Sequence, residues 1–400
     1  MMMNQIKSKI KSDQLLSYKG NIPMHYLVTI LIIYLLGVFY VLRNTQYKNI
    51  ILVYAFACIF LFKISFTYLP KFIQFLNEKG LQGVDLNKIT KDKVAEPIGL
   101  FPSILYFIFS LFYQLLYYND HKILLEYNAG LLSIIFMTFL GFVDDVLELK
   151  WRYKVILPLF ASLPLVLSYS GETSIRVFKF LNFIIKQKII NIGFFYYVYI
   201  ILLSVFCTNA INIYAGINGL EIGQSIIISF FISIHNLIEI VSNINKQPNQ
   251  NALILKQHFL SIIFILPFIA INLPTFSYNC YPSKGFVGNT LSYFCGIFLA
   301  VVSIFGHFSK TLILFLIPQL LNFFLSLPQL FNFKPCPRHR LPIINKKTNK
   351  LNYSDNFTLI NLILYMLGPL SEYHLVIILL LFQFVTCSFG LFLRYYVDIA

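Results

Sequence analysis

Charged residues are scarce in this chain, and few polar segments interrupt its apolar runs. Only 12% of the 400 residues are Asp, Glu, Lys or Arg, against roughly 25% in an average soluble domain. The mean hydropathy is +0.73, and the longest polar stretch is 332–372. These shortages exclude a sizeable soluble domain and predict one membrane domain whose function lies in its loops.

Cysteines are few as well. The six cysteines are scattered, with no CxxC pair and no histidine at ligand spacing. This pattern argues against a zinc site and against a disulfide framework. The net charge of +15 could suggest nucleic acid, but the way basic residues divide between loops indicates a lipid bilayer instead, and no nucleic-acid partner is predicted.

Apolar runs long enough to cross a bilayer, about 20 residues each, recur along the whole chain. We read eleven of them, at 25–42, 50–70, 98–118, 123–143, 155–170, 193–213, 219–242, 258–274, 289–306, 310–331 and 373–395. The first is long, rich in Tyr and without a small-residue cleavage site, so we interpret it as a true span and not a signal peptide. The predicted fold class is all-α membrane, a polytopic bundle of about 10–11 transmembrane helices.

The basic residues lie mainly on one side of this bundle. If the spans alternate, the loops on the N-terminal side hold 19 of the 31 Lys and Arg residues, which marks that side as cytoplasmic. The polar segments fall on the same side: GLQGVDLNK at 80–88, DDVLELKWRYK at 144–154, NAINIYAGINGLE at 209–221, YPSKGFVGNT at 281–290 and PCPRHR at 335–340. We therefore expect these segments to form one cytosolic-face catalytic groove.

The adjacent acids Asp144 and Asp145 end an apolar span and are followed by Lys150, Arg152 and Lys154. Charge is unfavourable near hydrocarbon, so acids placed there usually hold a cation or a basic partner. A solvated loop is the alternative, but the pattern favours a site for Mg²⁺ and phosphate. Helix neighbours diverge by about 100°, so one acid should face the metal or an acceptor phosphate and the other should hold a base such as Lys154.

Two further segments carry polar side chains suited to phosphate or metal. Asn209 and Asn212 are three residues apart and share one helix face; interhelical hydrogen bonding is the alternative. Arg338 and Arg340 flank His339 in a proline-rich loop, where arginine suits forked recognition of phosphate. A positive-inside anchor is the alternative for the two arginines.

Motifs along the chain resemble a known enzyme family. GFVDDVLELKWRYK, FCTNAINIYAGINGLEIGQS, YPSKGFVGNT, GHFSKT, PQLLNFFLSLPQLF and PCPRHRLP are similar, in order, to the eukaryotic UDP-N-acetylglucosamine:dolichyl-phosphate N-acetylglucosaminephosphotransferases. These enzymes are a branch of the polyprenyl-phosphate N-acetylhexosamine-1-phosphate transferases. The resemblance runs from about Phe72 to the C-terminus.

The resemblance implies transfer of GlcNAc-1-phosphate from UDP-GlcNAc to dolichyl phosphate with Mg²⁺ as cofactor, in the endoplasmic reticulum membrane. A homodimer is left open. It also implies three segments: a basic cytosolic segment at 1–24, an extra span and short loop at 25–49, and a phosphotransferase membrane domain at 50–400.

The resemblance further implies a role for each site residue. The catalytic group is Asp144, Asp145, Lys154, Arg338, His339 and Arg340. The substrate-binding group is Leu86, Gly216, Asn218 and Phe286 for uracil, Glu96 for ribose, Asn209 for pyrophosphate, Trp151 for the N-acetyl group, and Glu148. The implied metal ligands are Asn212 and Asn289.

One residue departs from the family pattern, because the family has FVGDT with an Asp as Mg²⁺ ligand where this chain has Asn289. An amide oxygen brings no charge, so metal affinity should fall. A weakened working site, an inactive homologue and a single inactivating change are all open. Glu148, four residues after Asp144 and so expected on the same helix face, is a candidate to restore the charge. A transporter is the other alternative class, although its site should lie at mid-membrane.

Overall fold

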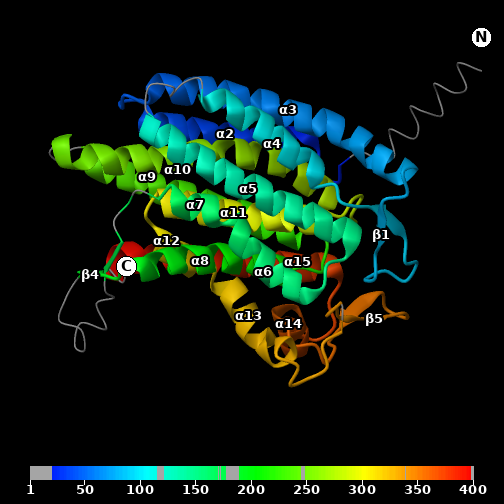
Figure 1. Cartoon of the computed structure of the whole chain (residues 1–400). Coiled ribbons are helices and arrows are strands. Elements are labelled where there is room, and N and C mark those ends of the chain that lie inside the picture. The colour runs from blue at the N-terminus through cyan, green and yellow to red at the C-terminus, as the bar shows by residue number, and fades with distance from the viewer. Residues whose placement is uncertain are drawn as a thin grey trace, which may run out of the picture.

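The computed structural model describes residues 20–114, 121–169, 171, 173–176, 189–244, 248–337 and 339–397. Its helices are α2 (Met24–Leu42), α3 (Lys48–Glu78), α4 (Leu100–Tyr113), α5 (His121–Leu147), α6 (Trp151–Ala161), α7 (Leu163–Leu167), α8 (Phe194–Ile213), α9 (Leu220–Ile244), α10 (Pro248–Asn279), α11 (Gly288–Phe305), α12 (Ser309–Phe315), α13 (Ile317–Leu330), α14 (Leu359–Leu367) and α15 (Glu372–Phe392), which the π-helical turn η3 (Leu393–Val397) extends. The long helices lie side by side in one bundle (Figure 1).

Short antiparallel hairpins lie at the two ends of the bundle. They pair β1 (Gln82–Val84) with β2 (Lys93–Ala95), β3 (Ser174–Arg176) with β4 (Ile189–Asn191), and β5 (Ile343–Asn345) with β6 (Lys350–Asn352). The β1 and β5 hairpins lie at one end and β4 at the other (Figure 1). The predicted all-α membrane fold is confirmed.

Each of the eleven apolar runs contains a helix, but not every run is one continuous span. Within the described residues, eight helices are long and apolar enough to cross a membrane, or nine if α12 and α13, bent by 70°, form one span. Proline explains two of the breaks, because it removes a backbone donor and clashes with the preceding turn. Pro158 lies near the end of α6 and Pro164 at the start of α7, while Pro318 lies at the start of α13.

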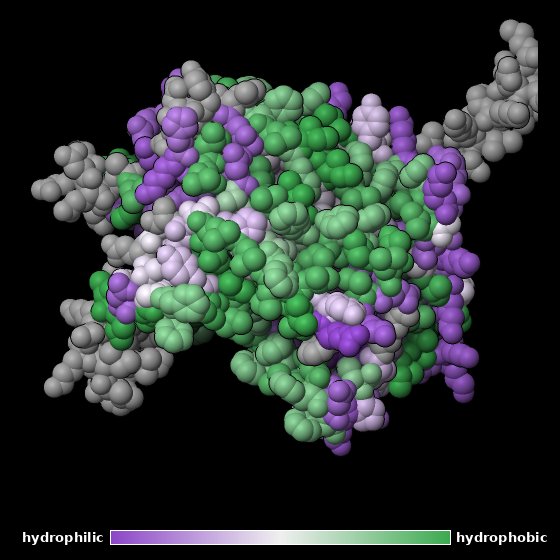
Figure 2. Space-filling model, viewed as in Figure 1, coloured by the Kyte–Doolittle hydropathy of each residue, from purple (hydrophilic) through white to green (hydrophobic). Residues whose placement is uncertain are grey.

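The centre of the bundle is formed by α10 and α11. In an apolar stretch of 18 residues, 94% of the residues are buried in α10 and 89% in α11. The surface of the bundle carries apolar side chains over its middle and polar ones toward its ends (Figure 2). With the candidate spans, this surface identifies a multi-pass membrane protein. Glycines let helices approach α11 closely: a Cβ on Gly141 of α5 would lie 2.6 Å from the Asn289 carbonyl oxygen, and one on Gly296 would lie 2.4 Å from Thr208 Cα of α8.

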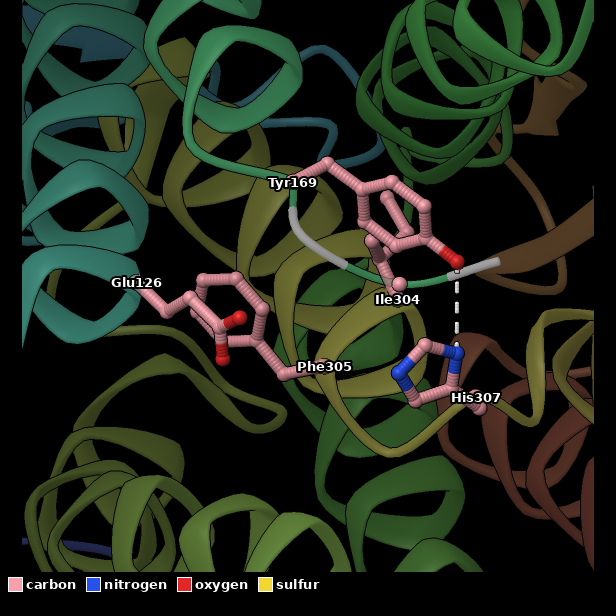
Figure 3. Close-up of a pocket in the computed structure, with 6 residues that line it drawn as sticks. Glu126, Tyr169, Ile304, Phe305 and His307 are labelled. Carbon is pink, nitrogen blue, oxygen red and sulfur yellow. Dashed lines mark hydrogen bonds between the residues drawn. The ribbon is translucent and has the colours of Figure 1, made fainter. Parts of the chain in front are cut away.

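A small polar cluster closes the end of the bundle where α5 begins and α11 ends. The Tyr169 hydroxyl lies 3.3 Å from His307 Nδ1, beside Glu126, Ile304 and Phe305 (Figure 3). Gln257 Nε2 lies 2.7 Å from His307 Nε2. The space between these side chains is too small for a water molecule, so we interpret His307 as a packing residue of this end.

Candidate active site

A cleft of about 1070 Å³ lies where α5 and α8 end and α9 and α11 begin. All five polar segments identified in the sequence contribute to its walls. Of the predicted site residues, those lining the cleft are Leu86, Glu96, Asp144, Asp145, Glu148, Lys154, Asn209, Asn212, Gly216, Asn218, Phe286, Asn289, His339 and Arg340. Arg338 and the side chain of Trp151 lie outside the described residues.

Asp144 is the acid that holds Lys154. Its side chain is 1% exposed, and its Oδ2 lies 2.7 Å from Lys154 Nζ, which is itself 27% exposed. Its Oδ1 accepts a hydrogen bond of 3.0 Å from the Leu149 backbone N–H. One buried carboxylate therefore closes the turn between α5 and α6 and fixes a cation at the cleft wall.

Asp145 binds the start of α11 instead. Its Oδ1 accepts from the Asn289 backbone N–H at 2.7 Å, and its Oδ2 accepts from the Thr290 backbone N–H at 2.8 Å and hydroxyl at 2.6 Å. A helix N-terminus carries partial positive charge and unpaired N–H groups, so the carboxylate stabilises it. Asp145 thus sets the position of Asn289, and its predicted contact with metal or acceptor phosphate stays a prediction.

The predicted placement of Glu148 one helical turn after Asp144 holds for its backbone, because the Glu148 N–H donates to the Asp144 carbonyl at 3.0 Å. The α5 helix ends at Leu147, and Glu148 adopts a left-handed conformation with φ of 50°. With this backbone angle the Glu148 side chain does not take the direction that it would have in a continued right-handed helix. Glu148 nevertheless lines the cleft. Its proposed role, to restore the negative charge that Asn289 does not supply, therefore stays a prediction.

Asn209 and Asn212 lie on the last turns of α8, and both line the cleft. The Asn209 amide N–H donates to the Val205 carbonyl at 2.9 Å, which fixes which side of that amide carries the oxygen. The close contact at Gly296 brings α8 against α11. Asn209 and Asn212 on α8 and Asn289 on α11 therefore lie on two helices that pack directly against each other.

The turn after α8 forms part of the cleft wall. Gly216 and Gly219 have φ of 118° and 92°, values that favour glycine. Asn87 Nδ2 donates to the Gly216 carbonyl at 2.7 Å, which joins the β1–β2 loop to this turn. The Phe286 backbone donates to the Ala95 carbonyl at 2.8 Å, so Leu86, Asn218 and Phe286 are held by three connected segments.

The sequence analysis missed the charged residues that fix the turn after α8. Glu372 Oε1 accepts from the Asn218 backbone N–H at 2.8 Å, and Lys88 contacts Glu372 Oε2 and lies 3.4 Å from Asp85 Oδ2. Glu221 Oε1 accepts from the Gly216 N–H at 3.2 Å. Glu372 follows a helix-capping Ser371 and so resembles an ordinary first-turn acid; nothing in the sequence links it to residues 85–88.

Basic residues of the 335–340 loop face the same cleft. His339 and Arg340 line it, and burial lowers the pKa of the Arg340 guanidinium, which nevertheless starts far above neutral and keeps its charge. Among the described residues, Arg340 Nη1 has no acceptor. A guanidinium with an unused donor beside a cleft suits an anionic ligand.

Glu96 is a half-buried acid between β2 and α4. Burial, followed by the charges of Asp145 and Glu221, raises the pKa of Glu96 from 4.5 to about 7. The folded protein therefore prefers the protonated carboxyl, and the stability associated with that proton is present below pH 4.5 and is lost as the pH rises through about 7.

We expect Glu96→Gln to raise the thermal unfolding midpoint of the ligand-free protein by roughly 5 °C at pH 8 and to leave it unchanged at pH 5. The amide removes the free-energy cost of ionising this carboxyl, and the folded protein has that cost only at the higher pH. Differential scanning fluorimetry in detergent at both pH values measures the unfolding midpoint. Glu78→Gln, on an exposed residue of α3, is the control, and an equal shift at both pH values would contradict the prediction.

Comparison with known proteins identifies a family and several relatives of this chain. Residues 127–307 match the family model for glycosyl transferase family 4. Proteins named UDP-N-acetylglucosamine–dolichyl-phosphate N-acetylglucosaminephosphotransferase are similar over most of their length. The one from Dictyostelium discoideum is 43% identical over 352 residues, 83% of this chain and 86% of the relative. Those from Schizosaccharomyces pombe and Saccharomyces cerevisiae are 35% and 32% identical, covering 84% and 76% of this chain and 90% and 82% of the relatives.

The fold and the polar cleft at one end of the bundle define a polytopic membrane glycosyltransferase. The chain belongs to the UDP-N-acetylglucosamine–dolichyl-phosphate N-acetylglucosaminephosphotransferase family. The resemblance seen in the motifs is thereby confirmed, and neither a transporter nor an inactive homologue is favoured.

Proposed function

We propose that this chain transfers GlcNAc-1-phosphate from UDP-GlcNAc to dolichyl phosphate, giving GlcNAc-PP-dolichol and UMP, the first step of N-linked glycan precursor synthesis. The observation that carries the proposal is that one cleft collects residues from five segments, and four of these segments contain motifs that resemble the family. The names of the similar proteins support the same reaction.

The reaction makes one bond and breaks one. An oxygen of the lipid phosphate attacks the β-phosphorus of UDP-GlcNAc, and the bond from that phosphorus to the bridging oxygen breaks, so that UMP leaves. A phosphomonoester has its second pKa at about 6, and the nucleophile is already largely ionised at neutral pH. The barrier is the approach of two anions, which calls for fixed cations and tight positioning.

The basic residues of the cleft supply those fixed charges. Lys154 is held by Asp144 at 2.7 Å and cannot swing away from the wall without leaving a buried carboxylate unpaired. Arg340 and His339 approach from the 335–340 loop. In this arrangement the side chains bind and orient both phosphates, and no strong general base is required.

The donor set of the cleft fits a Mg²⁺ ion carried mainly by substrate. Asn212 and Asn289 offer hard amide oxygens in the cleft wall, and within the described residues no group of three or more His, Cys, Asp and Glu side chains could hold a metal. Mg²⁺ often binds through one or two protein oxygens plus substrate phosphates. When bound, it would offset pyrophosphate charge, with Asp145 keeping Asn289 in position.

The proposed location is the endoplasmic reticulum membrane, with the cleft on the cytosolic face. The basic loops support this side, because Lys and Arg concentrate in cytoplasmic loops. The cleft lies at the end of the bundle that carries the β1 and β5 hairpins (Figure 1), and residues of those basic loops line it.

The test is an assay on purified protein with labelled UDP-GlcNAc, dolichyl phosphate and a Mg²⁺ titration. We expect labelled lipid and UMP in equal amounts, and neither product when dolichyl phosphate is omitted. Binding of UMP without product, with every polyprenyl phosphate tried, would contradict the proposal and indicate a nucleotide-binding homologue.

A further inference from the structure

A buried charged cluster lies at the turn that holds Asn218. It consists of Asp85 and Lys88 from the β1–β2 loop and Glu372 from the start of α15. Asp85 and Glu372 are only 5% and 4% exposed, and Lys88 lies between them and over the Tyr281 ring at 4.4 Å. Buried carboxylates are unfavourable unless they are paired, and the proposed transfer of the phosphate group does not use these two. We therefore looked for another role of the cluster.

The cluster fixes the orientation of the Asn218 side chain. Asn218 Nδ2 donates to Asp85 Oδ2 at 3.1 Å, while its backbone N–H donates to Glu372 Oε1. A carboxylate can only accept hydrogen bonds, so Asp85 can pair only with the NH₂ side of the amide. The amide therefore cannot turn over without placing its oxygen against a carboxylate.

The other side of the Asn218 amide is available to a ligand. Asn218 lines the cleft, and within the described chain no hydrogen bond reaches its Oδ1. Asp85 is held in turn: its Oδ1 accepts from the Asn87 backbone N–H at 3.1 Å, and Lys88 stabilises its charge. Asn218 thus presents a fixed acceptor.

A fixed acceptor distinguishes pyrimidine bases. The free edge of uracil carries one donor, N3–H, between two carbonyl oxygens, whereas cytosine has an acceptor at N3 and an amino group at C4. An amide oxygen that cannot exchange places with its NH₂ group suits uracil N3–H and opposes cytosine N3. We infer that Asp85, acting through Asn218, sets the preference of the site for uracil over cytosine. This inference rests on the proposed function and makes Asp85 a positioning residue.

The test measures inhibition of the transfer reaction by UMP and by CMP. In the chain as written we expect CMP to bind more weakly by on the order of a hundredfold, since a site built for one hydrogen-bond pattern rejects the reverse pattern. Asp85→Asn should reduce that ratio at least about tenfold, because an asparagine at 85 can donate as well as accept and lets the Asn218 amide turn over. General damage would weaken both nucleotides together and leave the ratio unchanged.

The matched control is Asp92→Asn, in the same loop. The Asp92 carboxylate is exposed and accepts from Thr90 Oγ1 at 2.7 Å, and no hydrogen bond between it and Asn218 is present in the described part of the chain. This control should keep the original ratio. If Asp85→Asn does not accumulate, Glu372→Gln should lower the ratio by about threefold, since Lys88 then loses one partner. An unchanged ratio in the variant that folds would overturn the inference. Absence of transfer from UDP-GlcNAc to dolichyl phosphate in the unaltered chain, before any nucleotide is added as inhibitor, would overturn the proposed function itself.

Discussion

Replacing Lys154 by alanine is expected to lower turnover by about a hundredfold or more, because the lysine offsets anionic charge inside a cleft where fixed charges are strongest. Its ammonium lies 2.7 Å from Asp144 Oδ2, and that acid is 1% exposed. Turnover at saturating UDP-GlcNAc and dolichyl phosphate measures the effect. The unfolding midpoint should also fall, since the variant leaves a buried carboxylate without its cation.

The double variant Asp144→Asn with Lys154→Ala separates the two effects. It removes both charges of the pair, so it should recover much of the lost stability while turnover stays low. Lys150→Ala is the matched control, because Lys150 is exposed and lies outside the cleft lining. Near-normal turnover in Lys154→Ala, or recovery of turnover in the double variant, would show that Lys154 acts only as a structural partner of Asp144.

Much of the architecture could be predicted from the sequence, because membrane helices depend on local composition. Each apolar run contains a helix, and the five polar segments that alternation placed on one side all line one cleft. The breaks were less visible. Whether Pro318 separates α12 from α13, which lie at 70° to each other, depends on packing, because prolines also lie inside the continuous helix α10.

The division of work between Asp144 and Asp145 could not be predicted from the sequence. Helical geometry required the two side chains to diverge, but their partners come from distant positions. Asp145 binds the start of α11, 144 residues further along the chain, and only tertiary packing shows that this helix end lies there. The orientation of Asn218 likewise depends on two residues that are distant in the sequence, Asp85 and Glu372. The proposed segments at 1–24, 25–49 and 50–400 stay predictions.

The last prediction concerns Asn289, where the family resemblance implies an Asp. Its backbone N–H donates to Asp145 at 2.7 Å, and this hydrogen bond fixes the position of the residue 289 backbone at the cleft wall. Asp144, Asp145, Lys154 and Asn212 line the same cleft, and each lies in a motif that carries the family resemblance. We therefore expect the chain as written to be active, with a raised Mg²⁺ requirement.

Asn289→Asp should lower the Mg²⁺ concentration for half-maximal activity by about tenfold, because a carboxylate adds charge to a hard oxygen donor. The Mg²⁺ dependence of UMP binding, measured without acceptor lipid, should shift in the same direction. If Glu148 supplies part of the missing charge from the loop after α5, Glu148→Gln should harm the chain as written more than it harms the Asn289→Asp variant. A complete Mg²⁺ titration that gives no product with Asn289 and robust product with Asp would contradict the expected activity. Position 289 would then be a single inactivating change in an otherwise intact site.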